Sequence, residues 1–238
     1  MQLSKRLQAV ASLVTPGNRV ADVGCDHAYT AIYLTEKHIS PHVIAMDVNQ
    51  GPIDRAKINI IKYGFGDRID VRKSDGLEKL NEHEADTILI AGMGGALTIQ
   101  ILSKRMEVVR NIRELVLQPQ SEIHLVRQML CEIGFLITSE NMLLEDGKYY
   151  VMMRAQAKEL VTDEKTYELT EEEHFYFGRL LLEQRHPVLM EYLVREQSIC
   201  ENIMREFLSE TTEKSRLRQQ ELKEKIDRIV KGRGYYNN

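Results

Sequence analysis

The chain has 238 residues and a net charge of −4; 43% of its residues are hydrophobic and 29% are charged. Such a chain can bury a core, and no apolar run approaches the ~18 residues of a membrane span, which excludes an integral membrane protein and a chain disordered throughout. The negative net charge argues against a protein that coats nucleic acid through bulk charge. Three isolated cysteines and an N-terminus without a signal-peptide core favour a cytoplasmic protein without disulfides or zinc.

Residues 1–157 alternate between short β-branched runs and helical patterns. Strands are expected at 19–23, 42–47, 68–73, 86–91, 114–118, 135–143 and 149–155, with helices at 28–37, 51–62, 95–106 and 121–132 between the first six. This alternation predicts a parallel sheet covered on both faces. Only a turn at Asp146-Gly147 joins the last two strands, so the last strand should run antiparallel to the rest. The resulting Rossmann-like α/β sheet is typical of class I methyltransferases.

The character of the sequence changes after this region. Residues 158–169 are polar and weakly patterned, and the remainder carries little strand signal. We therefore predict two domains, 1–157 and 158–238, the second made of helices. The segment TEEEHF should begin its first helix, with Thr170 as the cap.

A helical hairpin that packs like a coiled coil is expected in the second domain. Pro187 should end the first helix, a second should run from Val188 to about Leu208, and a third should follow a turn at Thr211-Thr212. One continuous long helix is the alternative. The tail GRGYYNN should be frayed.

Charge is unevenly distributed over these helices. Residues 159–213 carry 5 basic and 14 acidic side chains, whereas residues 214–233 carry 8 basic and 3 acidic ones. An acidic helix would pack favourably against a basic one. A globally acidic protein can in this way still present a local basic stripe to RNA.

The first predicted strand ends in a segment suited to a nucleoside cofactor, DVGCDHA over residues 22–28. Gly24 allows a sharp turn and a close approach to a ligand, and the next helix offers free N–H groups. Asp47 ends the second predicted strand, 23 residues after Gly24, and its carboxylate can accept hydrogen bonds from both hydroxyls of a ribose. NAD, FAD and S-adenosylmethionine all fit this spacing.

Asp26 discriminates among these cofactors. Dinucleotide-binding loops have a glycine at this position because it admits a pyrophosphate, which an aspartate would repel. S-adenosylmethionine has no phosphate and carries a sulfonium and an ammonium, so Asp22 and Asp26 favour it over NAD. Asp26 could also cap the helix over 28–37, a role compatible with ligand contact.

Three more loops follow strands at the same edge of the predicted sheet, where ligands bind. Each has two readings: SDG at 74–76 is a cofactor contact or an ordinary turn, AGMGG at 91–95 is a close backbone approach to a ligand or a tight turn, and QPQ at 118–120 meets a base edge or ends a strand. The 91–95 segment lacks the Asn/Asp-Pro-Pro-aromatic pattern usual in enzymes that methylate exocyclic amines. Ring nitrogens therefore remain possible targets.

Together these segments resemble one family, the bacterial tRNA (adenine-N1)-methyltransferases that modify adenine 22, the TrmK family. The matching segments are LSKRLQAVASLV, RVADVGCDHAYTAIYL, AMDVNQGPIDRAKINI, SDGLEKL, ILIAGMGG, LVLQPQSEIHLVRQML and EDGKYYVMM. Cys25 and Gln120 depart mildly from the family pattern, which more often has serine and asparagine there.

The resemblance implies a class I methyltransferase domain followed by a coiled-coil domain, S-adenosyl-L-methionine as methyl donor, and the D-arm adenine of tRNA as substrate, without a metal or a membrane. With the reasoning above, it predicts these cofactor contacts: Asp22, Gly24, Asp26, His27, Asp47, Val48, Asp75, Gly76, Gly92 and Met93. Contacts with tRNA are predicted at Lys5, Arg6, Arg216, Arg218, Lys223 and Lys225.

The expected chemistry is an in-line attack by N1 of neutral adenine on the sulfonium methyl group, which needs no strong base. The product ring is cationic, and Asp26 is the candidate to stabilise this charge. His27 or Gln118 would orient the base, and Tyr29 would stack on it. Two alternatives stay open: a methyltransferase for another RNA base or a small molecule, and a non-catalytic cofactor-binding module whose hairpin recruits a partner protein.

Overall fold

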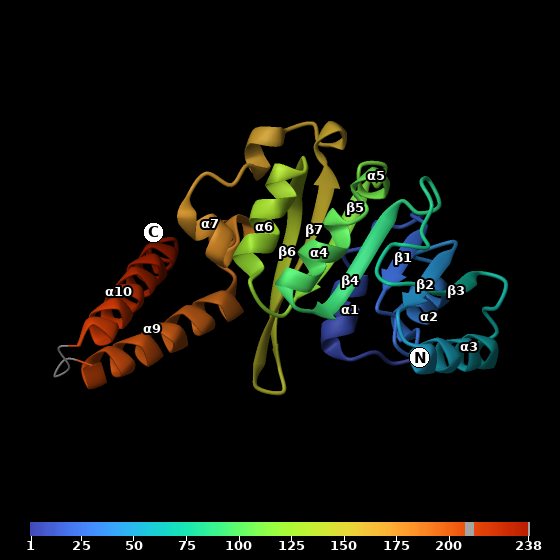
Figure 1. The fold of residues 1–238 in the computed structure, drawn as a ribbon. Coiled ribbons are helices and arrows are strands. Elements are labelled where there is room, and N and C mark those ends of the chain that lie inside the picture. Colours follow the sequence, from blue (N-terminus) through green and yellow to red (C-terminus); the bar gives the residue numbers. More distant parts are fainter. Residues whose placement is uncertain (208–211, 238) are drawn as a thin grey trace. The chain divides into compact units, whose positions relative to one another are not determined.

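The computed structural model describes residues 1–207 and 212–237 and divides into two compact units, Met1–Glu168 and Leu169–Asn238 (Figure 1). Leu208 and Thr211, where the sequence predicts a helix end and a turn, lie outside the described residues. Within the described ranges, no helix is both long and apolar enough to cross a membrane.

The first unit is built on one seven-stranded sheet in the order β3-β2-β1-β4-β5-β7-β6. The strands are β1 (Val20–Val23), β2 (Val43–Asp47), β3 (Ile69–Lys73), β4 (Thr87–Met93), β5 (Glu114–Pro119), β6 (Phe135–Glu145) and β7 (Lys148–Ala157). The pairs among β1 to β5 are parallel, and β7 runs antiparallel to both β5 and β6. The predicted Rossmann-like sheet with an antiparallel last strand is confirmed.

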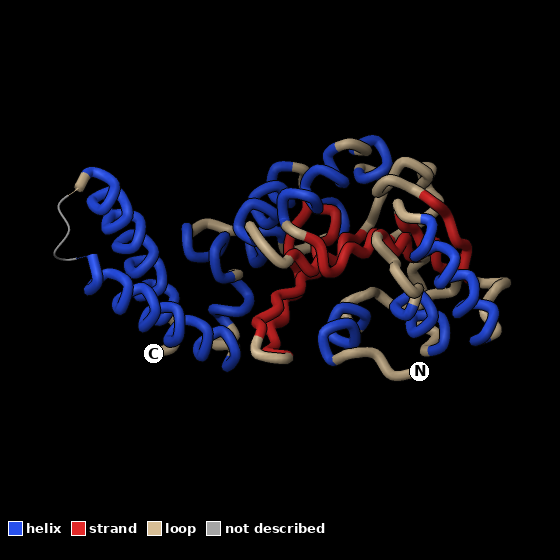
Figure 2. Tube along the Cα trace, turned by 60° about the horizontal axis from the view of Figure 1, so that its bottom comes forward, coloured by secondary structure: helices blue, strands red, loops and turns tan. Residues whose placement is uncertain are grey.

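Two groups of helices cover this sheet (Figure 2). They are α1 (Lys5–Ala11), α2 (Tyr29–Glu36) and α3 (Gln50–Tyr63) in one group, and α4 (Gly95–Ser103), α5 (Met106–Val109) and α6 (Ile123–Glu132) in the other. All residues of β1 and β5 are buried, as expected for strands that are covered on both faces. The predicted helix over 95–106 is shorter than expected and is followed by a separate turn, α5.

The β6–β7 hairpin has the tight turn that the sequence predicts. Asp146 and Gly147 both have positive φ, 50° and 74°, which suits an Asp-Gly pair because these residues tolerate the left-handed region. A bulge between Ile137 and Ser139 interrupts the ladder. After β7, residues 158–168 form two short 3-10 helices, η1 (Lys158–Leu160) and η2 (Glu164–Tyr167).

The second unit contains α7 (Glu172–Phe177), α8 (Arg179–Glu183), α9 (Pro187–Phe207) and α10 (Glu213–Gly234). The predicted cap at Thr170 is wrong, because Glu171 is the N-cap and forms a capping box with His174. The first predicted helix is also broken at Gly178, whose φ of 90° is not helical. Pro187 begins α9, a position where its missing N–H costs nothing.

The helices α9 and α10 pack against each other as an antiparallel pair, so the alternative of one continuous helix is wrong. Buried side chains on α9 (Leu189, Leu193 and Cys200) and on α10 (Leu222 and Ile229) form the apolar seam of this unit. The Lys225 Nζ donates to the Glu196 Oε2 across the pair at 2.7 Å, which agrees with the expected pairing of acidic and basic helices.

The end of α10 is held in place by two tyrosines. The Tyr235 hydroxyl lies 2.9 Å from the His174 Nε2, and the Tyr236 hydroxyl donates to the His186 carbonyl at 2.9 Å. The frayed tail predicted from GRGYYNN is therefore wrong as far as Asn237, because these hydroxyl groups anchor the segment to α7 and to the start of α9.

Candidate active site

Two adjoining cavities lie at the carboxyl ends of the parallel strands. The first, here called the Asp47 cavity, has a volume of about 350 Å³ and is lined by Val23, Gly24, Asp47, Val48, Asn49, Ser74, Asp75, Gly76, Ala91, Gly92, Met93, Leu97 and Ile101. The second, the Arg6 cavity, has a volume of about 260 Å³ and is lined by Arg6, Leu7, Asp22, Gly24, Cys25, Asp26, His27, Tyr29, Thr30, Ala91, Gly92 and Gln120. The two share Gly24, Ala91 and Gly92, so they form one continuous cleft at the edge where ligands of such sheets bind.

Asp47 is fixed between two loops of the Asp47 cavity. Its Oδ1 accepts a hydrogen bond from the Asn49 amide at 2.9 Å, and its Oδ2 accepts one from the Asp26 amide at 3.4 Å. The half-buried carboxylate keeps further lone pairs for a ligand, because each oxygen can accept more than one hydrogen bond. This arrangement suits the hydroxyl groups of a ribose.

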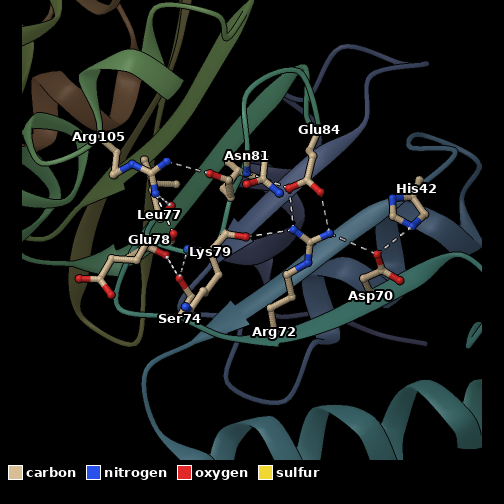
Figure 3. Close-up of polar contacts among 12 residues, drawn as sticks. His42, Asp70, Arg72, Ser74, Leu77, Glu78, Lys79, Asn81, Glu84 and Arg105 are labelled. Carbon is tan, nitrogen blue, oxygen red and sulfur yellow. Dashed lines mark hydrogen bonds and ion pairs between the residues drawn. The ribbon is translucent and has the colours of Figure 1, made fainter.

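The loop after β3 carries Asp75 and Gly76 and is held by two arginines (Figure 3). The Arg105 guanidinium donates to the carbonyls of Leu77, Glu78 and Leu80 at 2.9, 2.8 and 3.2 Å. Arg72 donates to the Lys79 carbonyl at 3.0 Å and to both oxygens of Glu84, whose pKa it lowers to about 2.

Neither arginine belongs to a motif, so these contacts could not be predicted from the sequence. Asp75 itself is half exposed and lies 3.6 Å from the Lys104 Nζ. The carboxyl that could meet an exocyclic amine is thus on a loop whose following residues, 77–80, are held by the two arginines.

Two glycines allow close approach in the centre of the cleft. Gly24 has a φ of 77°, and a Cβ there would collide with the Met93 Cε. Gly76 has a φ of 55°, and a Cβ there would lie 3.0 Å from Ile101. A side chain at either position would be strained and would intrude on the cavity.

Asp22 is the least satisfied polar group of the cleft. It is 3% exposed, lines the Arg6 cavity, and its Oδ2 has no hydrogen-bond partner within the described residues. Burial, and then the nearby charge of Asp47, raise the pKa of this carboxyl to about 7. A cationic group bound in the cavity would supply the missing partner. Burial also raises the pKa of the neighbouring Cys25 thiol, which argues against a nucleophilic thiolate.

The loop from Asp26 to Ala28 is strained and built around a charge cluster. Asp26 and Ala28 have positive φ values of 45° and 57°. The Asp26 carboxylate accepts from the Arg55 guanidinium at 3.0 Å and lies 3.6 Å from the His27 Nε2. The capping role considered for Asp26 is wrong, because Ala28 is the N-cap of α2 and no side chain caps that helix.

His27 and Tyr29 present their rings together in the Arg6 cavity. The ring centroids are 5.3 Å apart, with an interplanar angle of 10°. The Asn59 side chain donates to the His27 carbonyl at 3.0 Å and so ties the loop to α3. The stacked pair forms an aromatic wall of the kind on which a planar base can rest.

The two glutamines after β5 have different surroundings. Gln118 is completely buried, and its Oε1 accepts from the Arg6 guanidinium at 2.6 Å, so it does not line either cavity. Gln120 is exposed and lines the Arg6 cavity. The sequence singled out Gln118 and missed Gln120, although both belong to the QPQ segment.

Arg6 joins three elements at the edge of this cavity. Beside its bond to Gln118 on β5, its guanidinium lies 5.5 Å from the ring centroid of Tyr150 on β7. The Glu145 carboxylate at the end of β6 accepts from the amides of Lys5 and Arg6 at 2.8 and 3.4 Å. The Lys5 side chain is exposed.

Of the four basic residues on α10 that are predicted to contact tRNA, two form ion pairs within the described part of the second unit and two do not. Lys225 is bound to Glu196, and the Arg218 guanidinium lies 2.9 Å from Glu221. Arg216 and Lys223 are exposed and have no ion-pair partner within the described ranges. In residues 1–207 and 212–237 there is also no group of three or more His, Cys, Asp or Glu side chains placed to hold a metal ion.

Comparisons with known proteins agree with this architecture. A family model described as "Methyltransferase domain" matches residues 3–153. The tRNA (adenine(22)-N(1))-methyltransferase of Bacillus subtilis is 34% identical over 233 residues, which cover 96% of this chain and 94% of the relative.

Two solved structures are similar over nearly the full length. The B. subtilis m1A22 tRNA methyltransferase TrmK superposes with a TM-score of 0.86 at 31% identity and covers 97% of this chain and 98% of its own. The TrmK of M. capricolum, solved with S-adenosyl-homocysteine, superposes with a TM-score of 0.83 at 26% identity and covers 99% of each chain.

Proposed function

The chain belongs to the bacterial tRNA (adenine(22)-N1)-methyltransferase family, and we propose that its cleft transfers a methyl group from S-adenosyl-L-methionine to N1 of adenine 22 in tRNA. The observation that carries this proposal is the cleft itself, in which a ribose-type acceptor, Asp47, and a buried carboxyl, Asp22, lie in adjoining cavities. The Asp22 Oδ2 has no hydrogen-bond partner within the described residues. An acidic cleft suits a cationic, phosphate-free cofactor and would repel a pyrophosphate.

The residues of the cleft fit this cofactor. Asp47 would accept from the ribose hydroxyls, the loop with Asp75 and Gly76 would contact the adenine, and Asp22 would receive the ammonium group. Val48, Gly92 and Met93 would line the nucleoside part, as members of the Asp47 cavity. S-adenosyl-L-methionine, when bound, supplies an electrophilic methyl group on a sulfonium.

Residues that line the Arg6 cavity would position the target base and stabilise its charge. His27 and Tyr29 provide a stacked aromatic wall for a planar ring in the Arg6 cavity. N1 of adenine is unprotonated at neutral pH, so no residue has to remove a proton before the attack. The ring becomes cationic, and Asp26, oriented by Arg55, is the carboxylate proposed to stabilise this charge. Gln118 would act through Arg6, because it is buried behind it.

The tRNA would be held by basic side chains outside the cleft. Arg6 lines the Arg6 cavity and Lys5 is its exposed neighbour on α1. Arg216 and Lys223 are the two cations of the predicted set on α10 that have no ion-pair partner among residues 1–207 and 212–237. Arg218 and Lys225 would contribute less, since each already has a carboxylate partner. In the division of labour that we propose, the 1–157 region binds the cofactor and the 158–238 region contacts tRNA in the cytoplasm.

The proposal is tested with tritium-labelled S-adenosyl-L-methionine and unmodified tRNA transcripts, followed by nucleoside analysis. The expected product is 1-methyladenosine, and it should disappear when adenine 22 is replaced by another base. Asp26→Ala should lower turnover at saturating cofactor. Cofactor binding without any transfer to tRNA would instead favour another substrate.

A further inference from the structure

The segment after β5 carries two carboxamides that the fold treats differently. Gln118 ends the buried part of the strand, and Gln120 follows Pro119 at the mouth of the Arg6 cavity. Both side chains have the same donor and acceptor groups. Their availability to a ligand is therefore decided by their surroundings alone.

Gln118 is not available. Its side chain is 0% exposed, its Oε1 accepts from the Arg6 guanidinium at 2.6 Å, and its Nε2 lies 3.4 Å from the Pro119 carbonyl. The short bond to a guanidinium also fixes the orientation of the amide, because only the oxygen can accept it. Gln118 thus holds Arg6 in place and cannot read a base.

Gln120 is available. Its backbone amide donates to the Met93 carbonyl at 2.8 Å, which fixes its position beside the end of β4. Its carboxamide has no hydrogen-bond partner within the described ranges, and its Nε2 lies 3.8 Å from the point where a Cβ on Gly92 would stand. The group is therefore anchored through its backbone, free at its tip, and directed at the shared centre of the cleft.

We infer that Gln120 recognises the target adenine by a pair of hydrogen bonds to its N6 amine and N7. The Oε1 would accept from N6 and the Nε2 would donate to N7, the pairing by which glutamine and asparagine bind adenine in nucleic acids. These two bonds use the Hoogsteen edge and leave the lone pair of N1 uncovered, so N1 stays free for methylation. The inference rests on the proposed function and adds the group that selects the base.

The other side chains of the cavity do not offer this pattern. Asp26 only accepts when ionised, Asp22 is already used by the ammonium group in the proposed cofactor complex, and Arg6 only donates and is bound to Gln118. His27 has both kinds of nitrogen, but its Nε2 faces Asp26 and its ring faces Tyr29. Within the described lining of the Arg6 cavity, Gln120 alone carries a donor and an acceptor side by side on one planar group.

The test is a double-mutant cycle that combines a variant of the protein with a modified base in the RNA. Wild type and Gln120→Ala are each assayed on a tRNA transcript with adenine 22 and on one with 7-deazaadenine at position 22, which lacks the N7 acceptor but keeps N1 and N6. Wild type should lose roughly tenfold in kcat/KM on the 7-deaza transcript, in keeping with one half of a bidentate contact. Gln120→Ala should be slower on adenine but show no further loss on 7-deazaadenine.

Two additional variants sharpen the result. Gln120→Glu keeps an acceptor for N6 but loses the donor for N7, so it should also be insensitive to the 7-deaza change. Gln128→Ala, on the exposed face of α6, should behave as wild type on both transcripts. Melting temperature and S-adenosyl-homocysteine binding of Gln120→Ala should match those of wild type, because the exposed carboxamide makes no hydrogen bond within the described residues.

Equal sensitivity of wild type and Gln120→Ala to the loss of N7 would overturn the inference while leaving the proposed function intact. An insensitive wild type would also overturn it. Absence of 1-methyladenosine with wild type and the unmodified transcript would overturn the proposed function and this inference with it.

Discussion

Two buried carboxyl groups of the first unit have opposite surroundings. Between α6 and β6, the Glu140 Oε1 accepts from the Arg127 Nε and Nη2 at 2.9 and 2.8 Å, and both side chains are almost fully buried. In the cleft, Asp22 is equally buried but faces another carboxylate, Asp47, and leaves its Oδ2 without a partner. One oxygen of each carboxyl, the Glu140 Oε2 and the Asp22 Oδ2, has no hydrogen-bond partner within the described residues. The difference lies in the charge: Arg127 compensates that of Glu140, whereas a bound cation would have to compensate that of Asp22.

The difference between these two carboxyl groups indicates where a ligand binds in this fold. A buried charge costs several kcal/mol unless it is paired, so an unpaired one persists only where a ligand compensates for it. The paired carboxylate holds α6 to β6 and lines neither cavity. The unpaired carboxyl stands at the carboxyl end of β1, where the cofactor is proposed to bind.

The largest effect is expected from breaking the structural pair. Arg127→Met should lower the free energy of unfolding by about 3–5 kcal/mol, because it leaves the Glu140 carboxylate buried without a cation. Urea denaturation followed by circular dichroism would measure this loss. The double variant Arg127→Met/Glu140→Leu should regain most of it. A single variant as stable as wild type would contradict the assigned role of the pair.

A smaller effect, on binding rather than folding, is expected at Asp22. Asp22→Asn should weaken S-adenosyl-L-methionine binding by roughly 10- to 100-fold, the range for one hydrogen bond to a charged group. Isothermal titration calorimetry would measure the dissociation constant. Asp67→Asn, which changes an exposed carboxylate on the same unit, is the matched control and should bind as wild type. Unchanged affinity of Asp22→Asn would remove Asp22 from the cofactor site.

The free energy of unfolding and the affinity for the cofactor should both depend on pH through Asp22. Folding raises the pKa of Asp22 to about 7, so the folded apo-protein holds a proton that the unfolded chain has already lost. Its free energy of unfolding should therefore fall as pH rises towards 7, by up to about 1.4 kcal/mol per unit from this group. Cofactor affinity should rise over the same range, because a cation prefers the ionised carboxyl.

Titrations between pH 6 and 8 check both trends, and Asp22→Asn should remove the contribution of this group from each. Asp26, Asp47, Cys25 and His27 are other titratable groups at this end of the cleft. A pH trend in cofactor affinity that persists in Asp22→Asn would assign it to one of these groups instead.

The smallest effect is expected at the basic residues of α10, of which some have a carboxylate partner and others have none in the described ranges. Arg216→Glu/Lys223→Glu should raise the KM for tRNA roughly tenfold and reduce the slope of log KM against log salt by about 2, since two phosphate contacts are lost. Lys225→Gln should mainly lower the melting temperature, because it leaves Glu196 without its partner. Arg110→Glu is the control at an exposed arginine of the first unit. A salt slope unchanged in the double variant would exclude α10 from tRNA binding.

Much of the fold could be predicted because its signals are local. The β-branched runs and helical patterns placed all seven strands and the helices between them, with boundaries a few residues off. Where the predicted end of a helix was wrong, another nearby residue determined that end. Glu171 rather than Thr170 caps α7, because the His174 imidazole completes a capping box with it, and Gly178 interrupts the helix before Pro187 does.

The candidate site was predictable in part for the same reason. Gly24, Asp47, Asp75 and Gly92 follow strands that run parallel, so their convergence at one edge follows from strand order alone. The roles of Gln118 and Gln120 could not be separated in this way. Arg6, which donates a hydrogen bond to Gln118, is distant from it in sequence, and no spacing rule connects the two residues.

The sequence by itself determined the class of the sheet, the loops that face the ligand and the acidic character of the cleft, because each follows from residue type and from the alternation of strand and helix. Which charges are compensated depended on packing. Within the described residues, Asp22 has no cationic partner while Glu140 is paired with Arg127, and Lys225 is paired with Glu196 while Arg216 and Lys223 have no ion-pair partner. Pairing depends on contacts between elements far apart in the chain, and electrostatic interaction depends on distance and burial, which only packing defines.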